Sequence, residues 1–240
     1  MPNPTAAMLV IGDEILSGRT RDANMHHLAG ELTKHGVDLK EVRVVSDDPD
    51  AITTAVQALS AGYDHVFTSG GIGPTHDDIT ADNVARAFGR PIDVRDDARA
   101  ILAAHYEKTG HDLNDARLRM ARVPEGATLI DNPISAAPGF TIENVHVMAG
   151  VPTIFMTMVA SVLPTLSGGA PLLSQSLRIY RGEGDIAGPL SALADKYADL
   201  SIGSYPFQQD GAFGAHIVIR GADGAQVDAA MAELNGMFEA

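Results

Sequence analysis

The chain has 240 residues, a formal net charge of −14 and no cysteine. Such an acidic chain lacks the basic face that following a nucleic-acid backbone requires, so we do not expect nucleic acid as a partner. The lack of cysteine excludes disulfides, thiolate nucleophiles, iron–sulfur clusters and thiolate zinc sites, and it fits a reducing, cytoplasmic location.

The length suits one main domain with a small appendage, and a hydrophobic content of 45% is enough to fill a core. No stretch approaches the roughly 18 consecutive apolar residues of a membrane span. The segment Met1–Ala7 has no basic region followed by an apolar run, as a signal peptide would. We therefore expect neither export nor membrane insertion.

The chain opens with two units of strand, loop and helix. A short apolar strand, Ala7–Ile11, precedes a helical pattern that Asp22 caps and Gly36 ends. Val37–Val45 then alternates in part like a strand, and Pro49 opens a helix that runs to Gly62. This repetition is typical of a parallel sheet with crossover helices.

A third unit follows at once. His65–Ser69 reads as a strand, Gly70–Asp78 as a glycine-rich loop, and Ala81–Phe88 as a helix that Thr80 can cap. Three such units predict an α/β fold, a three-layer α/β/α arrangement around a doubly wound, mostly parallel sheet. In such sheets ligands gather at the carboxyl ends of the strands, where all three loops lie.

The rest of the chain divides into the end of a main domain, residues 1–167, and a small α+β domain, residues 172–240, separated by a Ser/Gly-rich linker. The elements predicted in the main domain are helices Asp96–Lys108, Asn114–Arg122 and Pro152–Leu163 and strands Thr128–Ile130 and Val145–Met148. The small domain has a β-α-β-β-α order and no chemical motif. Its predicted elements are Ser176–Arg181, Ile186–Tyr197, Ser201–Phe207, Ala215–Arg220 and Ala225–Phe238.

The loop after the third strand carries the sharpest chemical signal. Glycines between a strand and a helix let the backbone approach a ligand and direct N–H groups at an anion such as phosphate. The spacing matches neither GxGxxG nor GxxxxGK[ST], so it indicates neither a Rossmann nor a P-loop site. A tight turn that binds nothing is the alternative. The residues concerned are Gly70, Gly71, Gly73, Pro74 and Thr75.

Paired acidic residues follow each of the first three strands. In a doubly wound sheet these loops neighbour one another, and Mg²⁺ is usually held by one or two carboxylates together with substrate phosphates. Such an ion would reconcile an acidic site with an anionic ligand, although aspartates at these places also serve as helix caps. The pairs are Asp13 and Glu14, Asp47 and Asp48, and Asp77 and Asp78.

Other polar residues give weaker signals. Arg19 could contact a phosphate or simply lie in a solvated loop. Of nine histidines only His76 lies in the glycine-rich loop, and no HExxH spacing occurs, so a histidine-rich zinc site is not expected. The turn-rich segments Asn132–Gly139 and Gly150–Pro152 could line a cavity or connect strands.

Three segments resemble one known family. Ile11–Gly18, Ser69–Thr80 and Asn132–Gly139 resemble the molybdopterin-binding (MoCF biosynthesis) domain, specifically the branch of competence/damage-inducible protein A, CinA. The resemblance covers essentially the whole chain, because Ser201–Pro206 is similar to that family's small middle domain. We see no counterpart of the C-terminal amidase domain that longer relatives carry.

This resemblance implies a MoCF-type fold that binds molybdopterin or a dinucleotide such as ADP-ribose or FAD, self-associates, and in the CinA branch cleaves pyrophosphates with a divalent metal such as Mg²⁺. It implies catalytic roles for Asp47 and Asp78, which with Asp77 would hold the metal. The ligand-binding residues that it implies are Gly12, Asp13, Glu14, Gly70, Gly71, Gly73, Pro74, Thr75, Asn132, Pro138 and Gly139.

Two functions therefore stand side by side: a metal-dependent nucleotide pyrophosphatase, and a pterin-binding protein of molybdenum cofactor metabolism without turnover. The second draws on three departures from the family pattern. Ser135 stands where the family usually has Gly, Ala149 where it has Pro, and Ile154 where many relatives have Glu.

Overall fold

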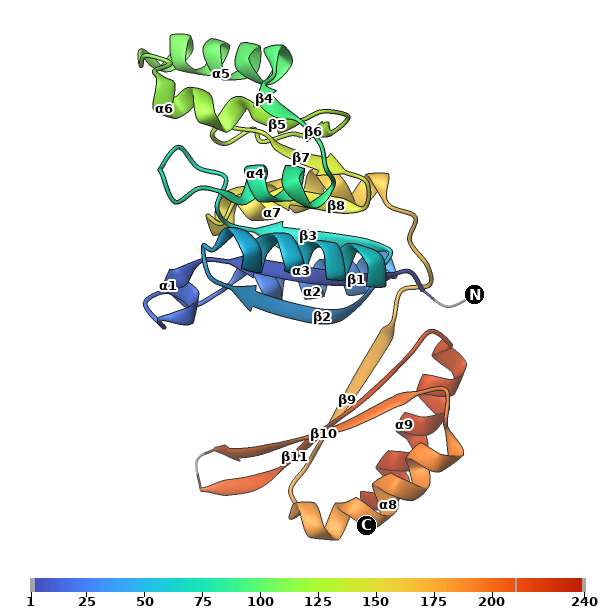
Figure 1. The fold of residues 1–240 in the computed structure, drawn as a ribbon. Coiled ribbons are helices and arrows are strands. Elements are labelled where there is room, and N and C mark those ends of the chain that lie inside the picture. Colours follow the sequence, from blue (N-terminus) through green and yellow to red (C-terminus); the bar gives the residue numbers. More distant parts are fainter. Residues whose placement is uncertain (1–2, 210, 239–240) are drawn as a thin grey trace. The chain divides into compact units, whose positions relative to one another are not determined.

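A computed structural model describes residues 3–209 and 211–238 of the chain. The chain forms two compact units, residues 1–169 and residues 170–240, which we call the larger and the smaller unit (Figure 1). Among the described residues, none of the helices has the length and apolarity needed to cross a bilayer.

A six-stranded sheet forms the centre of the larger unit, in the order β2-β1-β3-β8-β7-β6. Neighbours from β2 to β8 pair in parallel, whereas β7 pairs antiparallel with both β8 and β6. This confirms a mostly parallel sheet. The strands are β1 (Thr5–Ile11), β2 (Asp38–Val45), β3 (His65–Ser69), β6 (Thr128–Ile130), β7 (Gly139–Ile142) and β8 (Val145–Met148).

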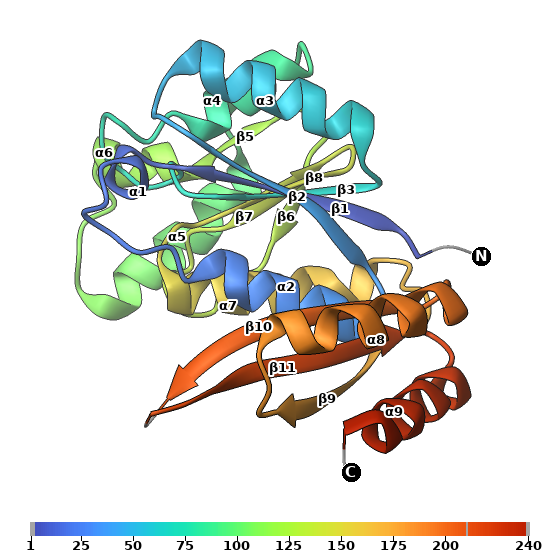
Figure 2. The same ribbon diagram turned by 90° about the horizontal axis from the view of Figure 1, so that it is seen from below.

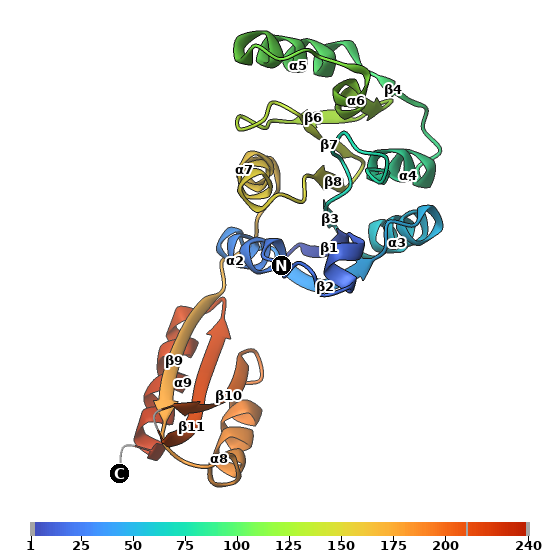
Figure 3. The same cartoon turned by 90° about the vertical axis from the view of Figure 1, so that its left-hand side faces the viewer.

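Helices cover both faces of this sheet, α2 and α7 on one and α3 and α4 on the other (Figures 2 and 3). The alternation of side chains along β1 explains the two cores: Ala7, Leu9 and Ile11 pack with α3 and α4, and Met8 packs on the opposite face with α2 and α7. The three-layer prediction is therefore confirmed. The helices are α2 (Asn24–His35), α3 (Pro49–Gly62), α4 (Thr80–Ala87) and α7 (Pro152–Val162), which continues as the 3₁₀ turn Leu163–Thr165.

The segment Asn114–Arg122 does not form the single helix that the sequence predicts there. The short helix α6 (Asp115–Leu118), whose Arg117 N–H is capped by the side chain of Asn114 at 3.0 Å, gives way to a 3₁₀ turn and then to a strand. That strand, β5 (Arg122–Pro124), pairs with β4 (Ile92–Val94) and includes only Arg122 of the predicted helix. Before α6 lies α5 (Asp96–Thr109), as predicted.

Two predicted helix caps have different outcomes. Asp22 lies one residue before Ala23, the N-cap of α2, and its carboxylate accepts the N–H of Met25 in the first turn at 2.9 Å. Thr80 does not cap α4. It is the first residue of that helix, fully buried, and its hydroxyl donates to the carbonyl of Gly70 at 2.9 Å. The hydroxyl therefore holds the glycine-rich loop against α4.

The smaller unit has the β-α-β-β-α order and an antiparallel sheet in the order β10-β11-β9. One face of this sheet packs on both helices around an apolar core that includes Ile179, Ile186 and Leu234. Its elements are β9 (Leu173–Ile179), α8 (Glu183–Lys196), β10 (Ser201–Gln209), β11 (Ala212–Gly221) and α9 (Gly224–Phe238).

Candidate functional site

A cavity of about 490 Å³ opens at the carboxyl edge of the larger sheet, where β3 and β8 end and the helix α1 (Asp13–Leu16) follows β1. We call it the main cavity. It brings together six of the residues predicted to bind ligand, Glu14, Gly70, Gly71, Gly73, Pro74 and Asn132, and the predicted catalytic and metal residue Asp78. The other lining residues are Thr20, Ile72, Met120, Ser135, Ala137, Ala149, Gly150, Val151, Pro152 and Ile154.

Close packing at this edge requires glycine. Gly70 has φ +107°, and a Cβ there would lie 2.2 Å from the carbonyl oxygen of Ile11. Gly71, at φ +69°, would place a Cβ 2.1 Å from the hydroxyl of Thr80. Tight packing thus explains both glycines without a ligand, while the same geometry leaves their backbone on the wall of the main cavity.

The side chains at the tip of the loop bind one another. Asp78 accepts the N–H of Thr75 at 2.8 Å, and the Thr75 hydroxyl lies 2.6 Å from Asp78 and 2.5 Å from Asp77. The hydrogen bond from Thr75 lowers the pKa of the Asp77 carboxyl. Asp77, Thr75 and His76 are exposed, and the structure brings only Asp78 of this group to the main cavity.

Asp47 lies at the end of β2, half-buried, and accepts the N–H of Asp13 at 3.0 Å. Burial raises the pKa of its carboxyl. The hydrogen bond from Asp13 opposes that rise, and the charges of Asp13, Glu14 and Asp77 add to it. The resemblance implies catalytic and metal-binding roles for both Asp47 and Asp78, and of the two only Asp78 lines the main cavity. Within residues 3–209 and 211–238, no three acidic or histidine side chains are arranged to hold a metal ion.

Asn132 organises the loop before β7. Its buried side chain accepts the N–H groups of Ile134 and Ser135 and donates to the Ser135 hydroxyl and the Ala137 carbonyl, at 2.7–3.2 Å. Gly139 lies inside β7, where a Cβ would meet the Val147 carbonyl at 2.3 Å. The segment 132–139 therefore lines the cavity and connects strands at once.

The remaining predicted ligand residues lie off the main cavity. Gly12 is buried at the end of β1, where a Cβ would meet the Glu14 carboxylate, and Asp13 is exposed. Pro138 is buried and lines a second cavity instead. Arg19 is exposed on the loop before α2.

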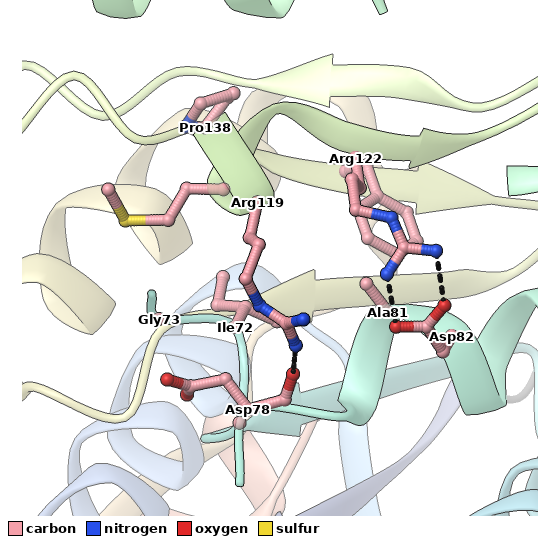
Figure 4. A pocket seen from close by; sticks show the side chains of 11 residues that line it. Ile72, Gly73, Asp78, Ala81, Asp82, Arg119, Arg122 and Pro138 are labelled. Carbon is pink, nitrogen blue, oxygen red and sulfur yellow. Dashed lines mark hydrogen bonds and ion pairs between the residues drawn. The ribbon is translucent and has the colours of Figure 1, made fainter. Parts of the chain in front are cut away.

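Sequence reasoning missed two polar residues at this edge. Buried Asn24 donates from Nδ2 to the Ser69 hydroxyl at 2.8 Å and the Gly150 carbonyl at 2.7 Å, which ties α2 to the ends of β3 and β8. Arg119 reaches the glycine-rich loop from the 3₁₀ turn after α6 (Figure 4). An asparagine on the apolar side of a helix was a signal for the first; the second had none beyond its positive charge.

Arg119 also lines a second, small cavity of about 20 Å³ that shares Gly71, Ile72, Gly73, Asp78 and Met120 with the main one. Its Nη2 donates to the carbonyl oxygen of Asp78 at 3.3 Å. Beside it, Arg122 makes a two-pronged ion pair with Asp82, with both N–O distances 2.7 Å. The backbone groups and the arginine at this edge can bind an anion, and its carboxylates can bind a cation or a water molecule. The apolar walls can pack against a ring.

Comparison with known proteins gives relatives for both units. A family model described as a probable molybdopterin binding domain matches residues 7–168, and one described as FAD synthase, middle domain, matches residues 171–240. A probable FAD synthase of Caenorhabditis elegans is 33% identical over 259 residues, covering 98% of this chain and 50% of that protein.

Two further relatives belong to the CinA branch. A CinA-like protein of Citrifermentans bemidjiense is 38% identical over 167 residues, covering 68% of this chain and 40% of that protein. The crystal structure of CinA from Thermoplasma acidophilum, titled a protein with unknown function, superposes with a TM-score of 0.62 at 33% identity. It covers 69% of this chain and 99% of that one. The chain thus spans half or less of the two curated relatives named here.

Proposed function

The chain belongs to the family of probable molybdopterin-binding domains, in its CinA-like branch, and from that premise we propose that it is a metal-dependent pyrophosphatase. Its substrate would be ADP-ribose or a related dinucleotide such as FAD, bound in the main cavity. Hydrolysis would release two monophosphates.

The main cavity is the observation that carries the proposal. Its volume of about 490 Å³ lies within the roughly 300–1,000 Å³ usual for small-molecule sites. Apolar side chains such as Ile72, Met120 and Val151 give a planar ring a surface, while Gly71 and Gly73 present backbone to a phosphate. A ligand with a heterocycle and a pyrophosphate matches both parts.

The acidic residues fit a divalent cation held by few protein ligands. The pKa of Asp47 is raised by burial and by three neighbouring carboxylates, so a cation there would relieve repulsion. Asp47 or Asp78 would hold the ion, because Mg²⁺ is usually bound through one or two carboxylates plus substrate phosphates. When bound, such an ion offsets phosphate charge and stabilises charge on the leaving oxygen.

The residues of this chain would share the remaining work. Backbone groups of Gly71 and Gly73 position the phosphate, and a carboxylate, Asp78 or Glu14, orients the attacking water. Thr75 holds the Asp78 carboxylate through two contacts, which fixes the direction from which it can accept a proton.

The names of the relatives support a nucleotide ligand. One relative is called a probable FAD synthase, and residues 171–240 match the middle domain of FAD synthase. FAD contains both a ring and a pyrophosphate, the two parts that the main cavity suits.

The test is AMP release from ADP-ribose and FAD by the purified chain, with and without Mg²⁺, Mn²⁺ or Co²⁺. We expect Asp78→Asn, which keeps an acceptor for Thr75, to remain folded and to lose at least about 100-fold in rate, as loss of an acid–base group typically costs. Asp195→Asn, an exposed change on α8, is the matched control and should keep full activity. Equal rates for Asp78→Asn and the wild type would refute the assignment.

A second function, pterin binding without turnover, is favoured by one observation. Ser135, Ala149 and Ile154, the three departures from the family pattern, all line the main cavity. A main cavity that keeps the glycine-rich loop but differs from the family at these wall positions suits a site that binds a ligand without cleaving it. Thermal stability measured with molybdopterin alone and with ADP-ribose plus Mg²⁺ separates the two functions, because a ligand of the native state raises the melting temperature.

A further inference from the structure

Arg119 carries a positive charge, and none of the catalytic or binding roles proposed above involves it. The guanidinium is half-buried, and within the described residues no carboxylate forms an ion pair with it. Its neighbour Arg122 is neutralised by Asp82 on both prongs. In Figure 4 the carboxylate of Asp78 points away from Arg119, whose one hydrogen bond to a described residue is to the Asp78 main-chain carbonyl. The charge of Arg122 is therefore balanced by Asp82, whereas no described carboxylate balances that of Arg119.

One N–H of Arg119 also has no partner. Its Nε is buried and makes no hydrogen bond to any described residue. A buried donor without a partner is costly, so such a group indicates a partner supplied from outside the chain. The small cavity beside it, about 20 Å³, has room for one water-sized group, such as a single oxygen atom. Because a guanidinium is positively charged, it binds the oxygen of an anion more strongly than a neutral oxygen.

The position of Arg119 relates this anion to the main cavity. The small cavity shares the Gly71–Gly73 backbone and Asp78 with the main cavity, so the same loop forms a wall of both. A phosphate at the loop can therefore extend one oxygen toward Arg119 while its organic part remains in the main cavity. Among the described residues, the charged side chains that line the small cavity are Arg119, Asp78, and the paired Arg122 and Asp82.

Building on the proposed function, we propose that Arg119 is the anion-recognition residue of this site and selects ligands that carry a phosphate or pyrophosphate at the Gly71–Gly73 loop. The guanidinium of Arg119 donates to a phosphate oxygen that enters the small cavity. It offsets the repulsion that the surrounding carboxylates exert on an anion. Neutral heterocycles lack this contact.

Inorganic pyrophosphate is the probe, and calorimetric titration of the full chain, with Mg²⁺ and with chelator, is the measurement. We expect Arg119→Met to raise the Kd for pyrophosphate about tenfold or more, and Arg119→Lys to restore part of the affinity as a point charge. Arg86→Met removes the same charge from α4, where Arg86 pairs with Asp50, and should change the Kd by less than about twofold.

A measurement on the unaltered chain covers the case in which Arg119→Met does not fold. The Nε–H resonance of Arg119, identified by its loss in Arg119→Lys, should shift when pyrophosphate is added and stay in place when adenosine is added. Unchanged affinity in Arg119→Met, equal loss in Arg86→Met, absence of binding by the wild type, or a resonance that does not move would each overturn the proposal.

These readouts require no turnover. A chain that binds pyrophosphate through Arg119 but releases no AMP would refute the proposed hydrolysis and leave the inference about Arg119 standing. If the wild type releases AMP and the KM is unchanged in Arg119→Met, the proposed hydrolysis stands and the inference about Arg119 is refuted.

Discussion

The two units bury side chains of different polarity. In the described part of the chain the fully buried polar side chains all belong to the larger unit, and Asn24, Ser69, Thr80 and Asn132 of this set gather around the carboxyl edge of its sheet. The core of the smaller unit is apolar throughout. Burying polar groups is favourable only when each finds a partner, so these residues mark where the fold is specified for more than packing.

Glycines differ in how closely other atoms pack around them. Gly70 and Gly71 lie against backbone or a buried hydroxyl at the site, whereas Gly184 and Gly188 on α8 of the smaller unit face open space. Gly214 in β11 is as tight as Gly70, with a Cβ 2.1 Å from the Ile179 carbonyl, so closely packed glycines occur in both units and the contrast is between the candidate site and α8. The following predictions are ordered from the largest expected effect to the smallest, and each tests this contrast.

Gly70→Ala should destabilise the chain by about 3–5 kcal/mol, because the new Cβ would overlap the Ile11 carbonyl at 2.2 Å and positive φ disfavours alanine. Gly184→Ala is the control, with an expected change within about 1 kcal/mol. Urea unfolding followed by far-UV circular dichroism measures both. Similar losses for the two variants would show that the contrast in packing is not real.

Acid should weaken the larger unit through His146. Burial and the nearby His65 lower the pKa of this side chain from 6.5 to about 4, so the unfolded chain binds its proton more readily than the folded chain. Stability from this group is present above the unfolded pKa and is lost as pH falls from 6.5 to 4. The loss is about 3 kcal/mol at pH 4, since one pKa unit corresponds to about 1.4 kcal/mol.

His146→Leu should therefore show a flatter fall in the free energy of unfolding between pH 7 and pH 4 than the wild type, measured by urea titration at each pH. The hydrogen bond between His146 Nδ1 and the Thr141 hydroxyl, 3.0 Å long, is lost at every pH and shifts the whole curve without changing its slope. Parallel curves for the variant and the wild type would contradict the role of His146.

Asn132→Ala should cost about 2–3 kcal/mol, because two backbone N–H groups and the Ala137 carbonyl lose a buried partner. Asn114→Ala, which removes one exposed helix cap, is the graded control and should cost about 1 kcal/mol. The comparison is made by urea unfolding, and a cost for Asn132→Ala no larger than that of the cap would mean that its network does not hold the loop.

The smallest effect is expected for Glu233→Gln in the smaller unit. Its carboxylate lies 2.6 Å from Lys196 and accepts from the Tyr197 hydroxyl at 3.1 Å; the bond from Lys196 lowers the pKa of Glu233. Exposed pairs contribute little and are screened by salt. We expect a slightly lower melting temperature at low salt, and equal melting temperatures at about 1 M salt. A difference that persists in salt would show that more than charge is involved.

The sequence alone predicted much of this protein because its strongest signals are local. Alternating apolar residues and helix boundaries repeat three times before residue 90, and the order of such units dictates a doubly wound sheet. The position of the main cavity follows from the same logic, since parallel strands bring the loops that follow them to one edge. The local signals were wrong over Asn114–Arg122, where the predicted helix is replaced by α6, a 3₁₀ turn and the first residue of β5.

Only the tertiary structure decided which members of this edge face one cavity. Asp78 lines it and Asp47 does not, although both follow parallel strands. The sequence predicts Thr80 as a helix cap, yet its hydroxyl donates to the carbonyl of Gly70, ten residues earlier in the chain. Arg119 reaches the loop from a segment 41 residues beyond Asp78, through a 3₁₀ turn that no local pattern marks. Local propensity determines which elements form, whereas the direction of a side chain depends on register and packing between elements that are distant in sequence.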